Sequence, residues 1–166
     1  MSGYAKLNNN KDWNTPKKYC DAVKDFFEEI DLDPCSNDGS ILECKIKYQL
    51  PEQDGLILSW MRHTFVNPPY GTGIKSWFKK AYSEYQNGNE ILMLVPVATN
   101  TSHWKEWVYD KAAAICFIYD TRLKFRINGN ENNKGAPMAC CFIYYGNNYI
   151  RFSSIFSSYG YCVKIS

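Results

Sequence analysis

The segment FVNPPYG, Phe65–Gly71, combines an asparagine, two prolines and a tyrosine at the end of a short apolar run. A proline lacks an amide donor and has a fixed φ, and the residue before it is restricted to extended conformations. The segment can therefore continue neither as a helix nor as a central strand. It is either a simple strand end or a rigid bracket that presents acceptor groups to a ligand.

As a bracket, the segment suits a planar group that carries an NH2. The carbonyl oxygens of Asn67 and Pro68 lie outside any helix, and the Asn67 side chain adds a further acceptor. The Tyr70 ring follows, and stacking of a base on such a ring is worth about 1–3 kcal/mol. Acceptors that hold both hydrogens let the nitrogen direct its lone pair at an electrophile, which stabilises the transition state. Because the segment supplies neither a carboxylate base nor a metal, the electrophile must be strong by itself, as a sulfonium methyl donor is.

The length and charge of the chain limit its organisation and partners. With 166 residues, we expect a single domain over residues 1–166, with a flexible polar N-terminus over residues 1–12. No separate target-recognition domain fits in this length. A formal net charge of +2 is too small to indicate nucleic-acid binding, which depends on many Lys and Arg side chains near phosphates. Any DNA-binding surface must come from local clusters of basic residues.

The cysteines and histidines do not predict a metal site. The seven cysteines are odd in number, include no C-x-x-C pair and follow no secretory signal, so reduced and mostly buried thiols are expected. The two histidines are not spaced with a cysteine or carboxylate as zinc ligands are. No apolar run is long enough to cross a bilayer. We therefore expect no metal and no membrane partner.

The hydrophobic pattern predicts an α/β fold with right-handed crossovers. Thr15 as N-cap and Pro16 in the first turn predict a helix over Pro16–Glu29. Further helices are expected at 74–85 and 102–112, and strands at 30–35, 45–50, 63–67, 90–97 and 113–120. The tail is strand-like on both sides of a Gly-Asn-Asn turn at 146–148, which predicts a C-terminal antiparallel hairpin.

Further motifs surround the bracket in a definite order: DWNTPKKY, DLDPCS, DGL and Trp60 before it, then Trp77, LVPVATNT and RLKF after it. NPPYG after an apolar strand is the catalytic motif of amino-group methyltransferases that use S-adenosylmethionine. The whole order resembles the phage-encoded, Dam-like DNA N6-adenine methyltransferases over about Trp13–Phe142. The resemblance implies a Rossmann-like, S-adenosylmethionine-dependent methyltransferase fold, with a mostly parallel sheet that the C-terminal hairpin completes.

The resemblance also implies a reaction. The enzyme would transfer a methyl group from S-adenosylmethionine to the exocyclic N6 amine of adenine in DNA, after flipping the base out of the stack. Asn67 and the Pro68 carbonyl would accept the two hydrogens of the target amine. Pro69 would complete the catalytic bracket, and Tyr70 would stack on the base. The protein would be encoded by a phage or prophage and would work in the cytoplasm of the bacterial host.

The same resemblance implies a set of cofactor-binding residues. These are Thr15, Pro16, Asp33, Pro34, Cys35, Asp54 and Asn67. The Thr-Pro pair would hold the methionine end of the cofactor, the Asp-Pro-Cys turn would face its amino acid moiety, and Asp54 would face its adenine. Each also has an explanation without a ligand, because an Asp before Pro or Gly is common in turns and Thr-Pro is sufficient to start a helix.

Basic residues near these motifs are the expected contacts to DNA. They are Lys75, Arg122, Lys124, Arg126 and Lys134, with Lys79 and Lys80 as a possible extension. Arg122 and Lys124 belong to the R-L-K-F motif, and Arg126 and Lys134 lie in a long polar loop at 126–137. A run of charges is otherwise most often a solvated face.

The sequence departs from the usual methyltransferase pattern in its first half. The turn after Asp33 has a glycine only at Gly39, and the chain before Asn67 is too short for two strand–helix units, so we expect one unit reduced to a turn. The acid that would hold the cofactor ribose is unassigned, with Glu43 a weak candidate. Two alternatives stay open: methylation of cytosine N4 or of a glutamine amide, and a catalytically inactive DNA-binding or interaction module of the same fold.

Overall fold

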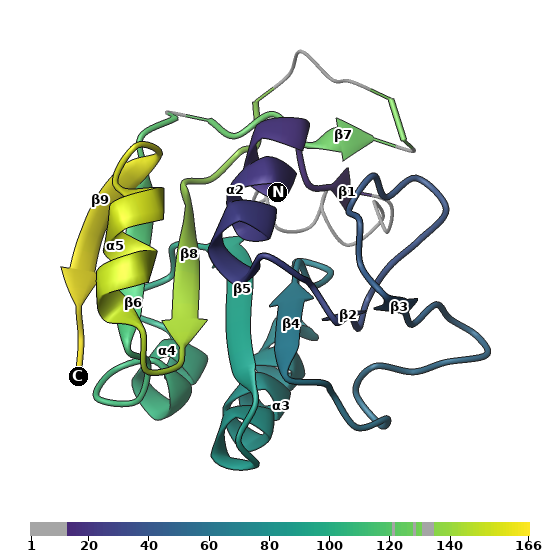
Figure 1. The fold of residues 1–166 in the computed structure, drawn as a ribbon, viewed down its shortest axis with the longest axis horizontal. Coiled ribbons are helices and arrows are strands. Elements are labelled where there is room, and N and C mark those ends of the chain that lie inside the picture. Colours follow the sequence, from purple (N-terminus) through teal and green to yellow (C-terminus); the bar gives the residue numbers. More distant parts are fainter. Residues whose placement is uncertain (1–12, 121, 128, 131–134) are drawn as a thin grey trace.

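The computed structural model describes residues 13–166 except for 121, 128 and 131–134. A seven-stranded sheet with the order β3-β2-β4-β5-β8-β6-β9 forms the centre, and β1 and β7 form a two-stranded sheet beside it (Figure 1). The large sheet consists of β2 (Leu32–Asp33), β3 (Ile46–Lys47), β4 (His63–Val66), β5 (Glu90–Pro96), β6 (Ala114–Ile118), β8 (Cys140–Tyr145) and β9 (Gly160–Lys164). The small sheet consists of β1 (Trp13–Asn14) and β7 (Arg126–Ile127). The helices are α2 (Lys17–Phe27), α3 (Ile74–Gln86), α4 (Ser102–Trp107) and α5 (Tyr149–Phe156), so the predicted α/β class is confirmed.

Most strands of the large sheet point the same way. Parallel pairs join β3, β2, β4 and β5. Strand β8 is antiparallel to both β5 and β6, so β6 runs in the direction of β5, and β9 is antiparallel to β6. The expected mostly parallel sheet is therefore present in strand direction, while the pairs beyond β5 are antiparallel.

The core lies around the centre of this sheet. The predicted apolar strand at 90–97 is β5, and its residues 91–95 are fully buried, as expected for a strand covered on both faces. Helices α2 and α5 pack together on one face, and α3 and α4 pack together on the other (Figure 1). In the described part of the chain, no helix has the length and apolar character that a membrane crossing needs.

The predicted C-terminal hairpin is wrong. Strands β8 and β9 are separated by β6, and helix α5 connects them. The helix forms because Asn148 caps it, with Oδ1 accepting a hydrogen bond from the Arg151 backbone N–H at 3.1 Å. Phe152 and Phe156, four residues apart, are both fully buried on one helical face. The β-forming composition of the tail concealed this helical spacing.

The chain between β2 and β4 contains less helix and strand than a normal α/β unit. Both connections, from β2 to β3 and from β3 to β4, run without a helix through described residues. The expectation that one strand–helix unit is reduced to a turn is thus confirmed, and the reduction applies to both units. The bracket directly follows β4, at the carboxyl end of a strand in this half of the sheet.

Candidate active site

The site lies where the direction of chain progress through the sheet reverses. After β2 the chain moves to β3 at the sheet edge, then returns to β4 on the other side of β2. Such a reversal makes the carboxyl ends of the two neighbouring strands a topological switch point, where open α/β sheets bind ligands. Asp33 ends β2, and Asn67 directly follows β4. The two motifs that the sequence placed 34 positions apart are therefore neighbours.

A cavity of about 420 Å³ lies at this switch point. Its walls come from four segments: the turn after β2, the segment 48–55, the bracket, and the start of α3. The predicted site residues among its walls are Pro34, Cys35, Asp54, Pro69 and Tyr70. The structure thus brings together the D-P-C, D-G-L and N-P-P-Y motifs around one hollow of the size typical of small-molecule sites.

The side chain of Asn67 is held in one orientation. Its Nδ2 donates to the Thr15 hydroxyl at 3.1 Å and to the Trp13 carbonyl oxygen at 3.4 Å. A backbone carbonyl can only accept, so the amide nitrogen must face Trp13 and the amide oxygen must face away. Among the described residues no donor is bonded to this oxygen. Asn67 Oδ1 is therefore available as an acceptor for another molecule.

Thr15 does not act as the helix cap that its position suggests. Helix α2 begins at Lys17, its N-cap is Pro16, and no side chain caps it. The Thr15 hydroxyl instead accepts the hydrogen bond from Asn67, although these residues are 52 positions apart. The explanation of Thr15 as a helix start alone is wrong, because its side chain is used to orient the bracket. Neither Thr15 nor Pro16 is part of the wall of the 420 Å³ cavity, so their contact with the cofactor stays a prediction.

The rest of the bracket is anchored from the protein side. Pro68 is buried, Pro69 is exposed, and the Tyr70 side chain is only 8% exposed. The Tyr70 hydroxyl donates to the Leu94 carbonyl oxygen of β5 at 3.1 Å, and its ring forms a T-shaped pair with the Phe125 ring at a centroid distance of 5.6 Å. Burial is the main reason why the pKa of Tyr70 is well above its usual value, so the hydroxyl stays protonated as a donor. Stacking of Tyr70 on a base stays a prediction, and the Phe125 ring contacts Tyr70 in this structure.

The Asp33–Cys35 turn connects the two strand ends. Asp33 Oδ1 accepts a hydrogen bond from the Cys35 backbone N–H at 3.1 Å, the turn geometry that an Asp before Pro suggests. The Cys35 thiol then reaches the Asn67 carbonyl oxygen at 3.2 Å. Burial raises the pKa of Asp33 to about 6 and that of Cys35 well above its usual value. The protonated thiol is a donor that ties the first strand end to the bracket.

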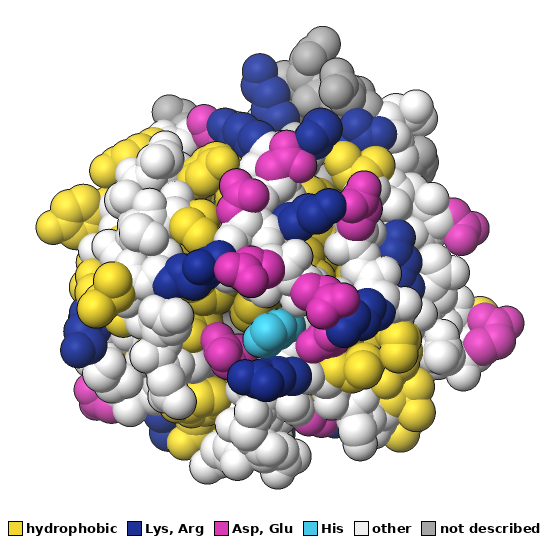
Figure 2. Space-filling view, viewed as in Figure 1, with side chains coloured by type: hydrophobic (Ala, Val, Ile, Leu, Met, Phe, Trp, Pro, Cys, Tyr) yellow, Lys and Arg dark blue, Asp and Glu magenta, His cyan; other side chains and the backbone are white. Residues whose placement is uncertain are grey.

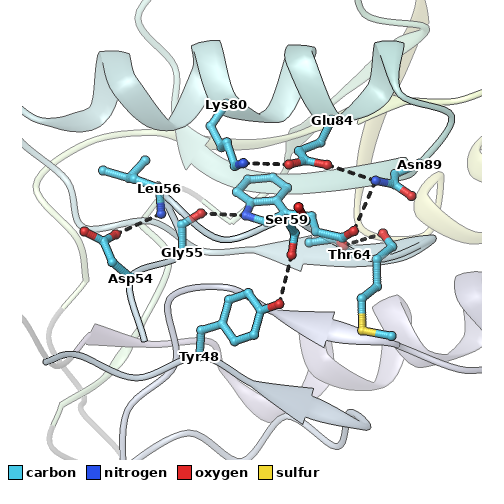
Figure 3. A network of polar contacts seen from close by, with 11 residues as sticks. Tyr48, Asp54, Gly55, Leu56, Ser59, Thr64, Lys80, Glu84 and Asn89 are labelled. Carbon is cyan, nitrogen blue, oxygen red and sulfur yellow. Dashed lines mark hydrogen bonds and ion pairs between the residues drawn. The ribbon is translucent and has the colours of Figure 1, made fainter. Parts of the chain in front are cut away.

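Asp54 and Gly55 form the opposite wall of the cavity. Asp54 Oδ1 accepts from the Leu56 backbone N–H at 2.9 Å, which closes a tight turn (Figure 3). At Gly55 an added Cβ would lie 1.9 Å from the Pro34 carbonyl oxygen, so only glycine fits. The turn explanation for Asp54 is therefore correct in geometry, and the turn also places its carboxylate in the cavity wall.

A polar and aromatic network supports this wall from behind. Trp60 Nε1 donates to the Gly55 carbonyl oxygen at 2.7 Å, and the Trp60 ring stacks on Trp77 of α3 with the ring centroids 6.3 Å apart. Lys80 forms an ion pair with Glu84 at 2.6 Å and lies over the Trp60 ring. The Lys80 side chain is 18% exposed and is engaged in this support. The suggestion that Lys80 extends the DNA-binding surface stays a prediction, and this ion pair speaks against it.

Basic residues gather on the other side of Thr15. In the R-L-K-F segment, Leu123 and Phe125 are buried while Arg122 and Lys124 are exposed. Arg122 and Lys124 line a second pocket together with Pro16, Lys18 and Asp120. Figure 2 shows Lys and Arg side chains at the upper end of the molecule, where β1, β7 and the start of α2 lie in Figure 1. We call the side chains of Lys18, Arg122 and Lys124 the basic pocket.

The other predicted DNA contacts differ in their placement. Lys75 forms an ion pair with Glu106 at 3.3 Å and lies over the Trp107 ring, so part of its charge is balanced. Arg126 belongs to β7 and donates to the Gly129 carbonyl oxygen. Lys134 lies outside the described residues. Glu43, the weak candidate for the ribose, forms an ion pair with Lys24 at 2.6 Å and is not part of the cavity wall.

Two contributors to the site are invisible in sequence patterns. The first is Gly55, whose need for a missing side chain comes from contact with a segment 21 positions earlier. The second is the Trp13 carbonyl, a backbone group that no residue type reveals. The pairing of β1 with β7, which places Trp13 beside the R-L-K-F segment, has no local sequence signal either. In the described part of the chain no cluster of His, Cys, Asp and Glu could hold a metal ion.

A sequence model of the family described as DNA N-6-adenine-methyltransferase (Dam) matches residues 4–160. The chain belongs to this family. A curated relative, the DNA N-6-adenine-methyltransferase of Escherichia phage T1, is 29% identical over 129 residues, which are 76% of this chain and 52% of the relative. The chain thus spans about half the length of that relative. No solved structure matches the chain significantly.

The Dam family match covers all residues that the motifs assigned to the site, from Thr15 to Lys134. The resemblance that the motif order indicated is thereby confirmed. The seven cysteines are all free, and four of them are buried, as predicted for reduced thiols.

Proposed function

We propose that the protein transfers a methyl group from S-adenosylmethionine to the N6 amine of adenine in DNA. The observation that carries the proposal is the fixed orientation of Asn67, whose amide nitrogen is held by Thr15 and by the Trp13 carbonyl. Asn67 directly follows β4, and Pro69 and Tyr70 of the same bracket line the cavity, although Asn67 itself is not part of its wall. Membership of the Dam family and the name of the phage T1 relative support the same reaction. The switch point at β2 and β4 supports a Rossmann-like fold for it.

The cavity fits the proposed cofactor in size and charge. S-adenosylmethionine carries a positive sulfonium and a planar adenine. The cavity includes two carboxylates, Asp38 and Asp54, and the rings of Tyr48 and Trp77, while none of the described residues in its wall is Lys or Arg. Pro34, Cys35 and Asp54 are the residues that would hold the cofactor there. When bound, it supplies an electrophilic methyl group, so that the nitrogen–carbon bond forms as the sulfur–carbon bond breaks and sulfur keeps that electron pair.

The residues of the bracket prepare the target amine. Asn67 Oδ1 and the Pro68 carbonyl oxygen accept its two hydrogens, which draws the nitrogen lone pair out of conjugation with the ring and stabilises the positive charge that develops on the nitrogen. The hydrogen bonds to Thr15 and Trp13 keep the acceptor in place before the substrate arrives. Both acceptors are weak bases, so the proton that the methylated amine loses passes to water.

The target base would enter from the side of the basic pocket. This path is supported by two contacts of the bracket: Asn67 bonds to Thr15, whose neighbour Pro16 lines the same pocket as Arg122 and Lys124, while Pro69 and Tyr70 line the cavity. Phosphates bound near Arg122 and Lys124 would hold the DNA backbone while an adenine is flipped toward Asn67. The location would be the cytoplasm of the bacterial host, consistent with a relative from a phage.

The experiment is methyl transfer from labelled S-adenosylmethionine to unmethylated duplex DNA, followed by digestion and identification of the methylated nucleoside. We expect N6-methyladenine with the wild type, and a fall in kcat of about 10²- to 10³-fold with Asn67→Ala, the loss typical of removing one charge-stabilising group. Cofactor affinity should change little. Asn67→Asp, which keeps an acceptor, should retain more activity than Asn67→Ala.

Other products would lead to other conclusions. N4-methylcytosine, or a methylated glutamine in a protein substrate, would contradict the choice of adenine while keeping the bracket chemistry. DNA binding without any methyl transfer, and without affinity for S-adenosylmethionine in calorimetry, would identify a binding module instead of an enzyme.

A further inference from the structure

Asn14 is a buried polar residue with a role that the cofactor and target contacts leave unexplained. It lies on β1, is 4% exposed, and both atoms of its side-chain amide are bonded. Its Oδ1 accepts from the Gly129 backbone N–H at 3.3 Å, and its Nδ2 donates to Asn37 Oδ1 at 2.8 Å. Because a backbone N–H can only donate, the contact to Gly129 fixes which way the amide points. The side chain therefore links two segments that are distant in sequence.

The segments on the two sides of Asn14 belong to different parts of the site. Asn37 lines the 420 Å³ cavity, and its Oδ1 also accepts from the Gly39 backbone N–H at 2.9 Å. Gly129 follows β7, which continues the chain from the R-L-K-F segment of the basic pocket. The two loops meet so closely that an added Cβ at Gly39 would lie 2.6 Å from the Gly129 nitrogen and 2.6 Å from Asn14 Oδ1. The cavity loop and the loop after β7 are thus in direct contact through Asn14.

The position of Asn14 in the chain adds a third connection. The next residue, Thr15, holds the Asn67 side chain, and the backbone of β1 pairs with β7. A displacement of the Gly129 backbone would therefore also displace the cavity loop, through Asn14, and the bracket, through Thr15. Buried polar groups of this kind are costly unless all their bonds are made, so the arrangement has a defined geometry and resists partial rearrangement.

We infer that Asn14 is a positioning residue that couples the cofactor cavity to the DNA-binding side, so that binding of either ligand strengthens binding of the other. The inference rests on the proposed function for the identity of the two ligands. DNA held at the basic pocket restrains the Gly129 backbone, and through Asn14 that restraint extends to Asn37 in the cavity wall. By linkage the effect is reciprocal, and such couplings commonly amount to about 5- to 150-fold in affinity.

The test is the affinity of S-adenosylhomocysteine, measured by calorimetry with and without a saturating duplex DNA. In the wild type we expect tighter binding with DNA present, and in Asn14→Ala we expect the ratio of the two affinities to fall toward one. Asn14→Asp should also lower it, because it keeps an acceptor for Gly129 but places a carboxylate against Asn37 Oδ1. Gly39→Ala, which forces the loops apart while Asn14 is retained, is a second variant and should act in the same direction.

The matched control is Asn148→Ala, which removes an equivalent amide that caps α5. It should lower the melting temperature, as the loss of an N-cap usually does, and leave the affinity ratio at the wild-type value. A merely structural Asn14 would weaken binding equally with and without DNA, so an unchanged ratio in Asn14→Ala overturns the inference. A wild-type ratio of one overturns it as well.

A second measurement separates this inference from the proposed function. Hydrogen exchange at the Gly39 amide, followed with duplex DNA and no cofactor, should slow in the wild type and stay fast in Asn14→Ala. If the wild type binds no cofactor analogue and transfers no methyl group, the proposed function fails. The exchange rate still decides whether DNA binding changes the cavity loop through Asn14. If DNA does not slow exchange at the Gly39 amide of the wild type, the coupling is contradicted.

Discussion

The two sides of Asn67 differ in their charge and in their construction. The cavity side has two carboxylates and several aromatic rings, and its walls are tied by short contacts between backbone segments, such as Gly55 against Pro34. The other side has Lys18, Arg122 and Lys124 with one carboxylate, on a segment where only alternate residues are buried. One side suits a small cation that must be enclosed, and the other suits a long polyanion that lies on a surface. The difference supports separate sets of binding residues for the two ligands of the proposed reaction.

The largest expected effect is on the cavity side, from Gly55→Ala. The added methyl would meet the Pro34 carbonyl, so the cavity wall must move. We expect cofactor affinity to fall more than tenfold and the melting temperature to drop by several degrees, with a much smaller effect on DNA affinity. Calorimetry with S-adenosylhomocysteine and thermal unfolding measure both.

Gly73→Ala is the stability control for that variant, because a Cβ at Gly73 meets no atom within 4 Å. Its melting temperature should be near the wild-type value. If Gly55→Ala weakened DNA and cofactor equally, the two sides would not be separable in the way that the charges suggest.

The second effect is on the DNA side, from the double substitution Arg122→Ala and Lys124→Ala. Each lost phosphate contact should reduce the slope of log affinity against log salt by about one, so we expect a decrease of about two for the pair. Binding of S-adenosylhomocysteine without DNA should be unaffected. Fluorescence anisotropy of a labelled duplex over a range of salt concentrations measures the slope.

Lys164→Ala provides the comparison for a lost positive charge elsewhere. Lys164 ends β9, at the end of the sheet opposite to β7 in Figure 1. Its removal should leave the salt slope unchanged. A similar decrease in slope for Lys164→Ala would mean that DNA affinity reflects net charge and not a defined pocket.

The third effect concerns the pH dependence of stability at Asp33. Burial raises its pKa from 3.8 to about 6 in the folded protein, so the protonated form is favoured by folding. The stabilisation is complete below the unfolded-state pKa and is lost as the pH rises through about 6, by about 3 kcal/mol for a shift of two pKa units. Asp33→Asn keeps the acceptor for Cys35 and removes the titration. The free energy of unfolding in urea, measured at pH 4 and pH 7, should fall more between these pH values in the wild type than in Asp33→Asn. An equal pH dependence of the two proteins would refute the prediction.

The smallest effect is expected from Tyr70→Phe, in the wall of the cavity. Tyr70→Phe loses the hydroxyl bond to Leu94 and should cost about 1 kcal/mol in the free energy of unfolding, with methyl transfer retained. Tyr70→Ala removes the ring and should also abolish base binding. Comparing the unfolding free energy and kcat of both variants separates the hydroxyl from the ring. Loss of activity in Tyr70→Phe would show that the hydroxyl, and not the ring face, is required.

The site was more predictable from sequence than the packing that supports it. The bracket at Asn67, the turn at Asp33 and the wall at Asp54 were assigned from motif order, and the structure places them around one switch point. Proline and aspartate restrict the backbone of the turn in which they lie, so the sequence alone reveals such turns. The bond from Thr15 to Asn67 joins residues 52 positions apart, and the sequence suggested only a helix cap. Partners that depend on tertiary contact leave no local pattern. Helix α5 differs, because its cap and its Phe152–Phe156 spacing are local but the β-forming composition of the tail conceals them.

The order in which the strands of the large sheet occur in the chain has a kinetic consequence. Strand β8 lies between β5 and β6 but follows both in sequence, so β5 and β6 cannot be joined until residues 140–145 are available. Pairing of β1 with β7 also waits until residue 127 has been made. Non-local contacts of this kind slow folding, because the chain closes long loops before the contacts compensate for the lost entropy. On the ribosome, the bracket would therefore acquire its final supports only after residues 126–145 have emerged, and a growing chain has little opportunity to act before that point.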